Sequence, residues 1–297
     1  MKIVSLLPSA TEIVAVLGAA DSLVGVSHGC DYPSEVCELP VVTSCVVPKE
    51  ASSSEIDAVV RAQLQDSEAL YAIDTDLLDR IAPDVIVTQA LCDVCAVSGV
   101  DVEAAVTGLP GNPAIVNMEP FSLGDVITTI QRLGDALGLD EKAEQVVGGL
   151  QARIDAVAQR TASHINYRPK TIVLDWIDPP FVSGHWMHDL IDLAGGEDIM
   201  GTRDTPSYTS DWDSLRAMRP DVLVFACCGF SEGRTRLELS RAGVDQILES
   251  FSAAGTRVFV FDGNALFSRP GPRLVDSLEL LAHHLHPDVH PMPEIIL

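Results

Sequence analysis

The sequence is poor in positive charge. It carries 19 Lys and Arg against 43 Asp and Glu, which gives its 297 residues a formal net charge of −24. A surface this acidic repels phosphate backbones and anionic membranes, so nucleic acid is not expected as a partner. The excess of acid also suits a salt-rich or crowded cytoplasm, or attraction to a cationic partner, and the sequence does not separate these alternatives.

Long apolar runs are missing too. No stretch reaches the roughly 18 to 20 apolar residues of a membrane helix, so the chain is not expected to span a membrane. Residues 1–20 superficially imitate an export signal, but Glu12 and the run Pro8-Ser9-Ala10-Thr11 interrupt its apolar part. A strand followed by a helix, capped by Ser9 or Thr11 and ending near Gly18, accounts for the same residues. The sequence therefore favours a cytoplasmic protein over a periplasmic or extracellular one.

Motifs of common enzyme sites are absent as well. The sequence has no GxGxxG after a strand and no GxxxxGK[ST] phosphate loop. No nucleophile with a base and an orienting acid is evident either. We therefore expect a binding protein and not an enzyme, with a redox or cluster-dependent enzyme as the alternative.

What the sequence does have is a regular alternation of short β-rich runs with helical patterns. Such alternation predicts an α/β fold with parallel sheets covered by helices on both faces. The length suits two lobes, each with its own core. The expected strands are Lys2–Leu6, Leu23–Val26, Val41–Thr43, Val85–Thr88 and Ala114–Asn117 in the first lobe, and Thr171–Asp175, Val222–Ala226 and Arg257–Phe261 in the second.

Residues 139–165 separate these two series of strands. From Asp140 to about Ser163, apolar residues recur at helical spacing without a proline, and a helix of that length would measure roughly 36 Å. We expect this helix to join an N-terminal lobe, residues 1–138, to a C-terminal lobe, residues 166–297. An ordinary helix packed inside one lobe is the alternative.

A weak internal sequence repeat supports the prediction of two similar lobes. The sequence DTDLLDRIAPDVIV at residues 74–87 matches DWDSLRAMRPDVLV at residues 211–224 in pattern. Each predicts a short helix capped by an acidic residue, then a proline break and a buried strand.

Cysteines gather at the ends of the predicted strands, where open parallel sheets bind their ligands. The odd total of seven cysteines argues against a complete disulfide framework. If the strand-end thiols converge, they could hold a metal ion or an iron–sulfur cluster, with redox activity as a further consequence. Cys92 and Cys95 have CxxC spacing, and they could instead be two small core residues. The strand-end residues are Cys30, Cys45, Cys92, Cys95, Cys227 and Cys228, whereas Cys37 falls on a predicted helix and is expected in the core.

Two histidines, His28 and His185, also lie beside predicted strand ends. Imidazole is a natural axial ligand for cobalt or iron, although a hydrogen-bonded or solvated histidine is the plainer interpretation of each. The histidines near the C-terminus are expected to form a polar surface cluster; they are His283, His284, His286 and His290.

Six segments, taken in order, resemble one protein family. They are SLLPSATEIVAVLG, GVSHGCDYP, APDVIV, IDPPFVSG, AGGEDIM and FSRPGPRLVDSLELLA. They look like the cobalamin- and iron-chelate-binding substrate-binding proteins of ABC importers, which have the class III periplasmic-binding-protein fold, and most of all like the periplasmic cobalamin-binding type. The resemblance covers nearly the whole chain. It implies two Rossmann-like lobes joined by one long helix, with the ligand in the cleft between them.

The resemblance also implies a ligand and the residues that face it. The ligand would be cobalamin, another corrinoid or a related metal chelate. Cys45 departs from the family, which has tryptophan there, and a helical segment at about Ser52 to Ala69 has no counterpart. The positions implied to face the ligand are Ser9, Ala10, Tyr32, Phe181, Tyr208, Asn264 and Phe267.

The same resemblance implies a partner. In the family, one exposed acidic residue on each lobe docks on basic sites of an ABC permease. Asp76 and Asp213 occupy the matching helix starts, and helix capping is the alternative role for both.

Overall fold

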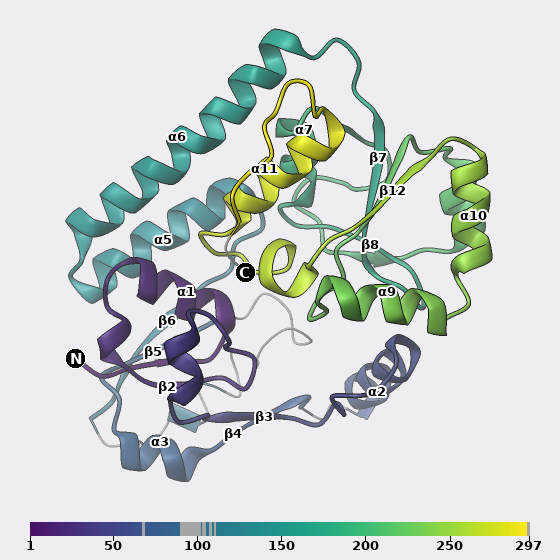
Figure 1. Ribbon diagram of the computed structural model, residues 1–297. Helices are drawn as coiled ribbons and strands as arrows, with labels where there is room; N and C mark the ends of the chain where they lie inside the picture. Colours follow the sequence, from purple (N-terminus) through teal and green to yellow (C-terminus); the bar gives the residue numbers. More distant parts are fainter. Residues whose placement is uncertain (67–68, 90–101, 103–104, 107–108, 110, 296–297) are drawn as a thin grey trace. The chain divides into compact units, whose positions relative to one another are not determined.

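The computed structural model describes residues 1–66, 69–89, 102, 105–106, 109 and 111–295 (Figure 1). The chain forms two compact units. Unit 1 contains residues 1–51, 58–120 and 127–148, and unit 2 contains residues 52–57, 121–126 and 149–297. The units thus interleave along the sequence, and the division at residues 138 and 165 stays a prediction.

Unit 1 is built on a four-stranded parallel sheet with the order β2-β1-β5-β6. Its central strands are continuous apolar runs that are wholly buried, as expected for strands covered on both faces. The strands are β1 (Ile3–Ser5), β2 (Leu23–Val26), β5 (Val85–Thr88) and β6 (Ala114–Asn117), and the helices include α1 (Pro8–Val16), α3 (Thr75–Ile81) and the 3₁₀ turns Ala20–Ser22 and Ser34–Glu38.

Three local expectations for unit 1 are wrong. Val41 makes only an isolated bridge to Val26, and the strand that follows, β3 (Thr43–Cys45), pairs antiparallel with β4 (Tyr71–Ile73) in a separate two-stranded sheet. The first helix has no side-chain cap, because its N-cap residue is Leu7, whose side chain has no hydrogen-bond acceptor, and proline at the first position has no amide hydrogen to satisfy. Cys37 is exposed on its short 3₁₀ turn and is not a core residue.

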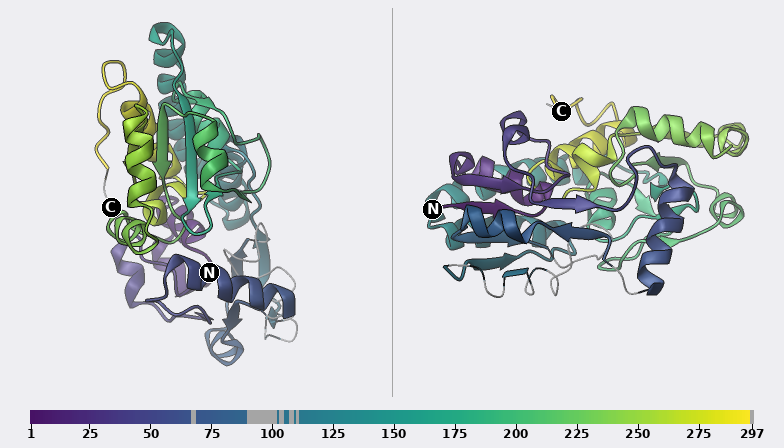
Figure 2. Two further views of the ribbon diagram at one scale, coloured as in Figure 1. Left: turned by 90° about the vertical axis from the view of Figure 1, so that its right-hand side faces the viewer. Right: turned by 90° about the horizontal axis from the view of Figure 1, so that it is seen from below.

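Unit 2 is built on a larger mixed sheet with the order β10-β8-β7-β11-β12, and β9 (Glu197–Asp198) also pairs with β7. Its parallel strands are β7 (Lys170–Trp176), β11 (Val222–Phe225) and β12 (Arg257–Val260), while β8 (Phe181–Val182) and β10 (Tyr208–Thr209) run antiparallel at one edge. Helices lie on both faces of this sheet (Figure 2). They include α7 (Met187–Leu193), α8 (Trp212–Ala217), α9 (Glu232–Arg241), α10 (Asp245–Ala253) and α11 (Leu274–Leu285).

Three helices start in one unit and end in the other: α2 (Ser53–Asp66), α5 (Leu123–Leu137) and α6 (Asp140–His164). Helix α6 is one uninterrupted rod of 25 residues (Figure 1). It starts with two acidic residues, which favour a helix N-terminus, and it contains no proline. The expected fold, two α/β units with parallel sheets joined by one long helix, is confirmed.

The internal sequence repeat, at residues 74–87 and 211–224, corresponds to two equivalent helix starts. Asp74 accepts a hydrogen bond from the Leu77 N–H at the start of α3, and Asp211 accepts one from the Ser214 N–H at the start of α8. Each helix leads into a buried parallel strand, β5 or β11. The expectation of acid-capped helices is therefore confirmed at both places.

Within the described residues, no helix has both the length and the apolarity to cross a membrane.

Candidate functional site

Each unit has one edge where its parallel strands end, and we call this its carboxyl edge. Open parallel sheets bind ligands at such edges because the strand-end loops and helix N-termini converge there. The carboxyl edge of unit 1 is formed by the loops after β1, β2 and β5, and that of unit 2 by the loops after β7, β11 and β12.

The carboxyl edge of unit 1 contains a chain of neutral hydrogen bonds. The Thr11 hydroxyl donates to Ser5 Oγ at 2.8 Å, and Cys30 Sγ lies 3.1 Å from Thr11 Oγ1 and 3.2 Å from Ser27 Oγ. The loop after β2 is thereby tied to α1. Cys30 thus lies among hydroxyl groups, which are poor metal ligands.

The family positions Ser9 and Ala10 are buried in α1, at 2% and 0% exposure. The Ser9 hydroxyl makes no hydrogen bond within the described residues, and the Thr88 hydroxyl at the end of β5 makes none either. Unpaired buried hydroxyl groups are rare in folded proteins, so these two are candidate hydrogen-bonding groups at this edge. Tyr32, also implied by the family, is half-buried.

His28, Cys45 and Tyr71 come together beside the end of β2. The His28 ring stacks on the Tyr71 ring with 5.4 Å between centroids, and its Nδ1 lies 2.7 Å from Thr43 Oγ1. Cys45 is the direct neighbour of Tyr71 across the β3–β4 pair. Burial, and then the positive charge of Lys49, lower the pKa of His28, so its imidazole is neutral at pH 7.

The carboxyl edge of unit 2 contains a carboxyl group. Asp175, near the end of β7, accepts a hydrogen bond from the Ser207 hydroxyl. Burial raises the pKa of Asp175 to about 6, although the bond from Ser207 acts in the opposite direction. Cys227 is fully buried nearby, and its burial together with the charge of Asp175 raises the pKa of its thiol well above the usual range. Cys227 is therefore a protonated core thiol and a poor metal ligand.

Aromatic rings follow the same strands. The Trp176 ring lies 4.9 Å from the Phe230 ring between centroids. Phe181 is half-buried and pairs with Trp176 across β7 and β8. Tyr208, on the neighbouring strand β10, is 42% exposed and donates its hydroxyl hydrogen to the Met200 carbonyl.

His185 is surrounded by rings. Its imidazole lies 5.7 Å from the Phe121 ring and 5.6 Å from the Trp186 ring, and burial lowers the pKa of His185. The backbone at this point is tight, since a Cβ on Gly184 would lie 2.3 Å from the Thr205 carbonyl oxygen. His185 is thus a neutral imidazole held on a constrained loop.

Phe267 and Asn264, the last two positions implied by the family, differ in their exposure to solvent. Phe267 is 1% exposed and stacks on Phe261 with 5.4 Å between ring centroids, and its carbonyl accepts the Trp186 indole hydrogen. It is a core residue in this structure. Asn264 is half-buried, and its backbone N–H donates to the Phe230 carbonyl.

Convergence of the cysteines on a metal gains no support. Among the described residues, no group of three or more His, Cys, Asp or Glu side chains could hold a metal ion. Cys92 and Cys95 lie outside the described residues. Cys228, after β11, is half-buried and forms no disulfide. The residues that the structure describes therefore give no support to an iron–sulfur cluster.

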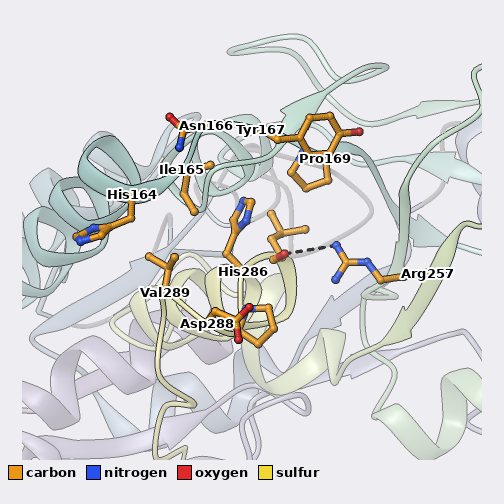
Figure 3. Close-up of a pocket in the computed structure, with 11 residues that line it drawn as sticks. His164, Ile165, Asn166, Tyr167, Pro169, Arg257, His286, Asp288 and Val289 are labelled. Carbon is orange, nitrogen blue, oxygen red and sulfur yellow. Dashed lines mark hydrogen bonds between the residues drawn. The ribbon is translucent and has the colours of Figure 1, made fainter.

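A pocket of about 320 Å³ lies at the opposite edge of the unit 2 sheet, beside Pro169 before β7 and Arg257 at the start of β12 (Figure 3). The expectation of a histidine surface cluster near this end is wrong. His290 is 2% exposed, and the other three are half-buried, with a ring nitrogen of each hydrogen-bonded to a backbone carbonyl group. Such bonds fasten the C-terminal segment to the unit.

Several residues of these edges were not singled out from the sequence. Trp176 is the last residue of β7 and Phe230 follows β11, so their positions in the sequence were an available signal. Tyr71 and Phe121 had none, since their contacts with His28 and His185 depend on pairing between distant parts of the chain.

Comparison with known proteins identifies the family. The family model described as "Periplasmic binding protein" matches residues 3–251. The chain belongs to the periplasmic binding protein family. The resemblance that the sequence motifs predicted is thus confirmed.

Individual relatives agree with this family. The chain is 24% identical over 292 residues to an uncharacterized ABC transporter substrate-binding lipoprotein, YvrC, of Bacillus subtilis, with 97% of this chain and 80% of that protein covered. It is 22% identical over 303 residues to a vitamin B12-binding protein of Vibrio cholerae, with 96% and 88% covered. The solved periplasmic heme-binding protein HutB of Vibrio cholerae superposes with a TM-score of 0.70 at 17% identity and 97% and 99% coverage.

The comparisons also correct one expectation. The relatives are a lipoprotein and periplasmic binding proteins, so they point to an extracytoplasmic location, and the expectation of a cytoplasmic protein is wrong. That expectation depended on residues 1–20, which fold into β1 and α1 of unit 1. Residues that build a core strand and helix carry no information about export. Periplasmic binding proteins are substrate-binding proteins of ABC importers, so at the family level the expectation of a non-enzyme is confirmed.

Proposed function

We propose that this chain binds one corrinoid, or a related metal chelate such as heme, as the extracytoplasmic substrate-binding protein of an ABC importer, and catalyses no reaction. The observation that carries the proposal is similar in both units: a histidine whose pKa is lowered by burial lies in contact with aromatic rings near the carboxyl edge. In unit 1 this is His28 with Tyr71, and in unit 2 it is His185 with Phe121 and Trp186.

These groups match the chemistry of a flat metal chelate. Ring faces suit a planar and partly apolar macrocycle. An imidazole can coordinate cobalt or iron only when it is unprotonated, and burial lowers the pKa of both His28 and His185. The names of the relatives support the same class of ligand, since one binds vitamin B12 and another binds heme.

The positions implied by the family carry unequal weight in this proposal. Tyr208 is exposed, and Tyr32, Phe181 and Asn264 are half-buried, so all four side chains have surface for a ligand. The remaining positions, Ser9, Ala10 and Phe267, are buried and would shape the site from behind.

The docking of a permease through Asp76 and Asp213 belongs to the same proposal. The helix starts are capped by Asp74 and Asp211, so the two candidate docking residues are not needed as caps. Asp213 is 84% exposed, although it pairs with Arg216. Exposed charges of this kind affect association more than folding.

Titration of the purified protein with cyanocobalamin, cobinamide and heme tests the ligand. We expect saturable binding of at least one of them at one molecule per chain, measured by absorbance and by calorimetry. The variants His28→Ala and His185→Ala would show which imidazole alters the absorption bands of the bound metal. Absence of binding by all three macrocycles would refute the proposal.

A further inference from the structure

Helix α2 starts as a part of unit 2, although its later residues belong to unit 1. We call Ser52–Asp57 the strap. It lies in the segment that has no counterpart in the family resemblance, so the proposed function leaves it unexplained.

The start of α2 is capped by its own residues. The Ser52 hydroxyl oxygen accepts from the Glu55 N–H at 3.3 Å, and Glu55 Oε2 accepts from the Ser52 N–H at 2.7 Å. This reciprocal pair is a capping box, which satisfies free amide groups at a helix N-terminus. The first turn of α2 therefore has a cap of its own within the helix.

Unit 2 nevertheless holds this turn through a buried carboxylate. Glu238 of α9 is 0% exposed, and its Oε2 accepts the Ser53 N–H at 2.9 Å. Its Oε1 pairs with Arg234 at 3.1 Å and with Arg241 at 2.8 Å. A buried carboxylate requires donors at both oxygens, so the strap completes the set of partners that makes this burial tolerable.

The carbonyl of Ser53 is used as well. It accepts the indole N–H of Trp176 at 3.2 Å, where β7 ends. The Trp176 ring contacts Phe230, and the Arg234 guanidinium lies over the Phe230 ring at 5.0 Å. Ile56 of the strap packs against the same hydrophobic cluster. Both peptide groups of Ser53 are thus engaged at the carboxyl edge of unit 2.

We propose that the strap is a positioning element of the ligand site, which holds the half-buried Trp176 ring against the buried Phe230 ring in one orientation, so that Trp176 binds the face or rim of a flat chelate. The inference depends on the proposed function, because it assigns Trp176 to that ligand. A ring held by the free protein loses less freedom when the ligand binds, so affinity rises without a new contact. Ligand affinity should therefore depend on Ser53, which need not touch the ligand.

The test separates the backbone of Ser53 from its side chain. Ser53→Pro removes the N–H that binds Glu238, and proline is well tolerated at the first position of a helix. Ser53→Ala keeps both peptide groups. Thr75→Pro places a proline at the first position of α3, which belongs to unit 1, and controls for proline itself. Glu238→Met, which keeps the length of the side chain but removes both acceptor oxygens, is the second variant if Ser53→Pro does not fold.

Two measurements are made on each variant. In the free protein, the exchange of the Trp176 indole hydrogen is followed by NMR and assigned with Trp176→Phe. The dissociation constant is then measured for cyanocobalamin, cobinamide and heme. We expect Ser53→Pro to speed the indole exchange and to weaken binding by about tenfold, the effect of one hydrogen bond to a charged group. Ser53→Ala and Thr75→Pro should match the unmodified protein.

The outcomes are distinguishable. Unchanged indole exchange in Ser53→Pro, or in Glu238→Met if that variant must replace it, would overturn the strap as a positioning element. Faster exchange with unchanged affinity would overturn its link to the ligand. If the unmodified protein binds no macrocycle, the proposed function fails, and the exchange data alone decide whether the strap fixes Trp176.

Discussion

At the carboxyl edge of unit 1, Thr11, Ser27 and Cys30 are joined by neutral hydrogen bonds, whereas the carboxyl edge of unit 2 depends on two carboxyl groups, Asp175 and Glu238. Neutral hydrogen bonds each contribute little to stability and do not titrate near pH 7. A buried carboxylate paired with charged groups, such as Glu238, contributes several times as much to stability, and the raised pKa of Asp175 makes its contribution depend on pH. Two units with similar sheets are therefore expected to respond differently to mutation and to acid.

Removal of the Glu238 carboxylate should show this difference most strongly. Glu238→Ala leaves Arg234 and Arg241 without their shared partner and frees the Ser53 N–H, so we expect a loss of about 4 kcal/mol in the free energy of unfolding. Urea unfolding measures it. Glu232→Ala, which removes an exposed acid of the same helix paired with Arg236, is the control and should cost less than about 1 kcal/mol. Equal losses would mean that Glu238 is not special.

A methyl group at Gly184 should be the next most harmful change. The new Cβ would lie 2.3 to 2.5 Å from backbone atoms of residues 205–207, which cannot move aside as a flexible side chain can. Gly184→Ala should therefore cost about 3 kcal/mol. The matched change in the strand-end loop of unit 1 is Gly29→Ala, whose Cβ would meet Pro8 at an ordinary 3.4 Å. A Gly29→Ala loss as large as that of Gly184→Ala would contradict this account.

Asp175 should make unit 2 sensitive to pH. Its pKa is raised from 3.8 to about 6 in the folded protein. Between these values the folded chain keeps a proton that the unfolded chain releases, so stability falls as pH rises through this window, and the full cost is present above about pH 6. Asp175→Asn should remove that cost, on the order of 2 kcal/mol at pH 7.5.

Urea unfolding of both proteins at pH 4 and pH 7.5 checks this prediction. The advantage of Asp175→Asn should appear at pH 7.5 and be largely absent at pH 4. An advantage of the same size at both pH values would show that packing, and not charge, is responsible.

The smallest effect is expected in unit 1. Thr11→Val keeps the shape of the side chain but removes its hydrogen bonds to Ser5 and Cys30, so we expect a loss of about 1 kcal/mol that does not change between pH 5 and pH 7.5. Thr11→Ser retains the hydroxyl and should lose less. A strong dependence on pH would mean that Cys30 titrates in this network, and the contrast between the two edges would then be weaker.

Much of the local structure was predictable. The strands Leu23–Val26, Val85–Thr88 and Ala114–Asn117 have the expected limits, and α6 lies within one residue of its expected ends. These elements are marked by apolar runs or by helical periodicity, which are local signals. The caps at Asp74 and Asp211 were predictable for the same reason.

The candidate site was less accessible. Phe267 was implied by the family as a ligand residue, yet it is buried against Phe261. Tyr71 was passed over, although it stacks on His28. Burial and contact depend on which distant segments pack together, so a side chain's place in the sequence does not decide whether it reaches the surface.

The α/β alternation, the long helix α6 and the acid-capped starts of α3 and α8 are each encoded in a continuous stretch of residues, and the family is encoded in short motifs, so all of them follow from the sequence. Three other features arise only when the chain folds. Folding pairs β3 with β4, at residues 43–45 and 71–73, it places Ser52–Asp57 in unit 2, and it raises the pKa of Asp175. Strand pairing, the contacts of the strap and the burial of Asp175 each depend on residues that are far apart in the sequence. Those residues become neighbours only when the chain folds.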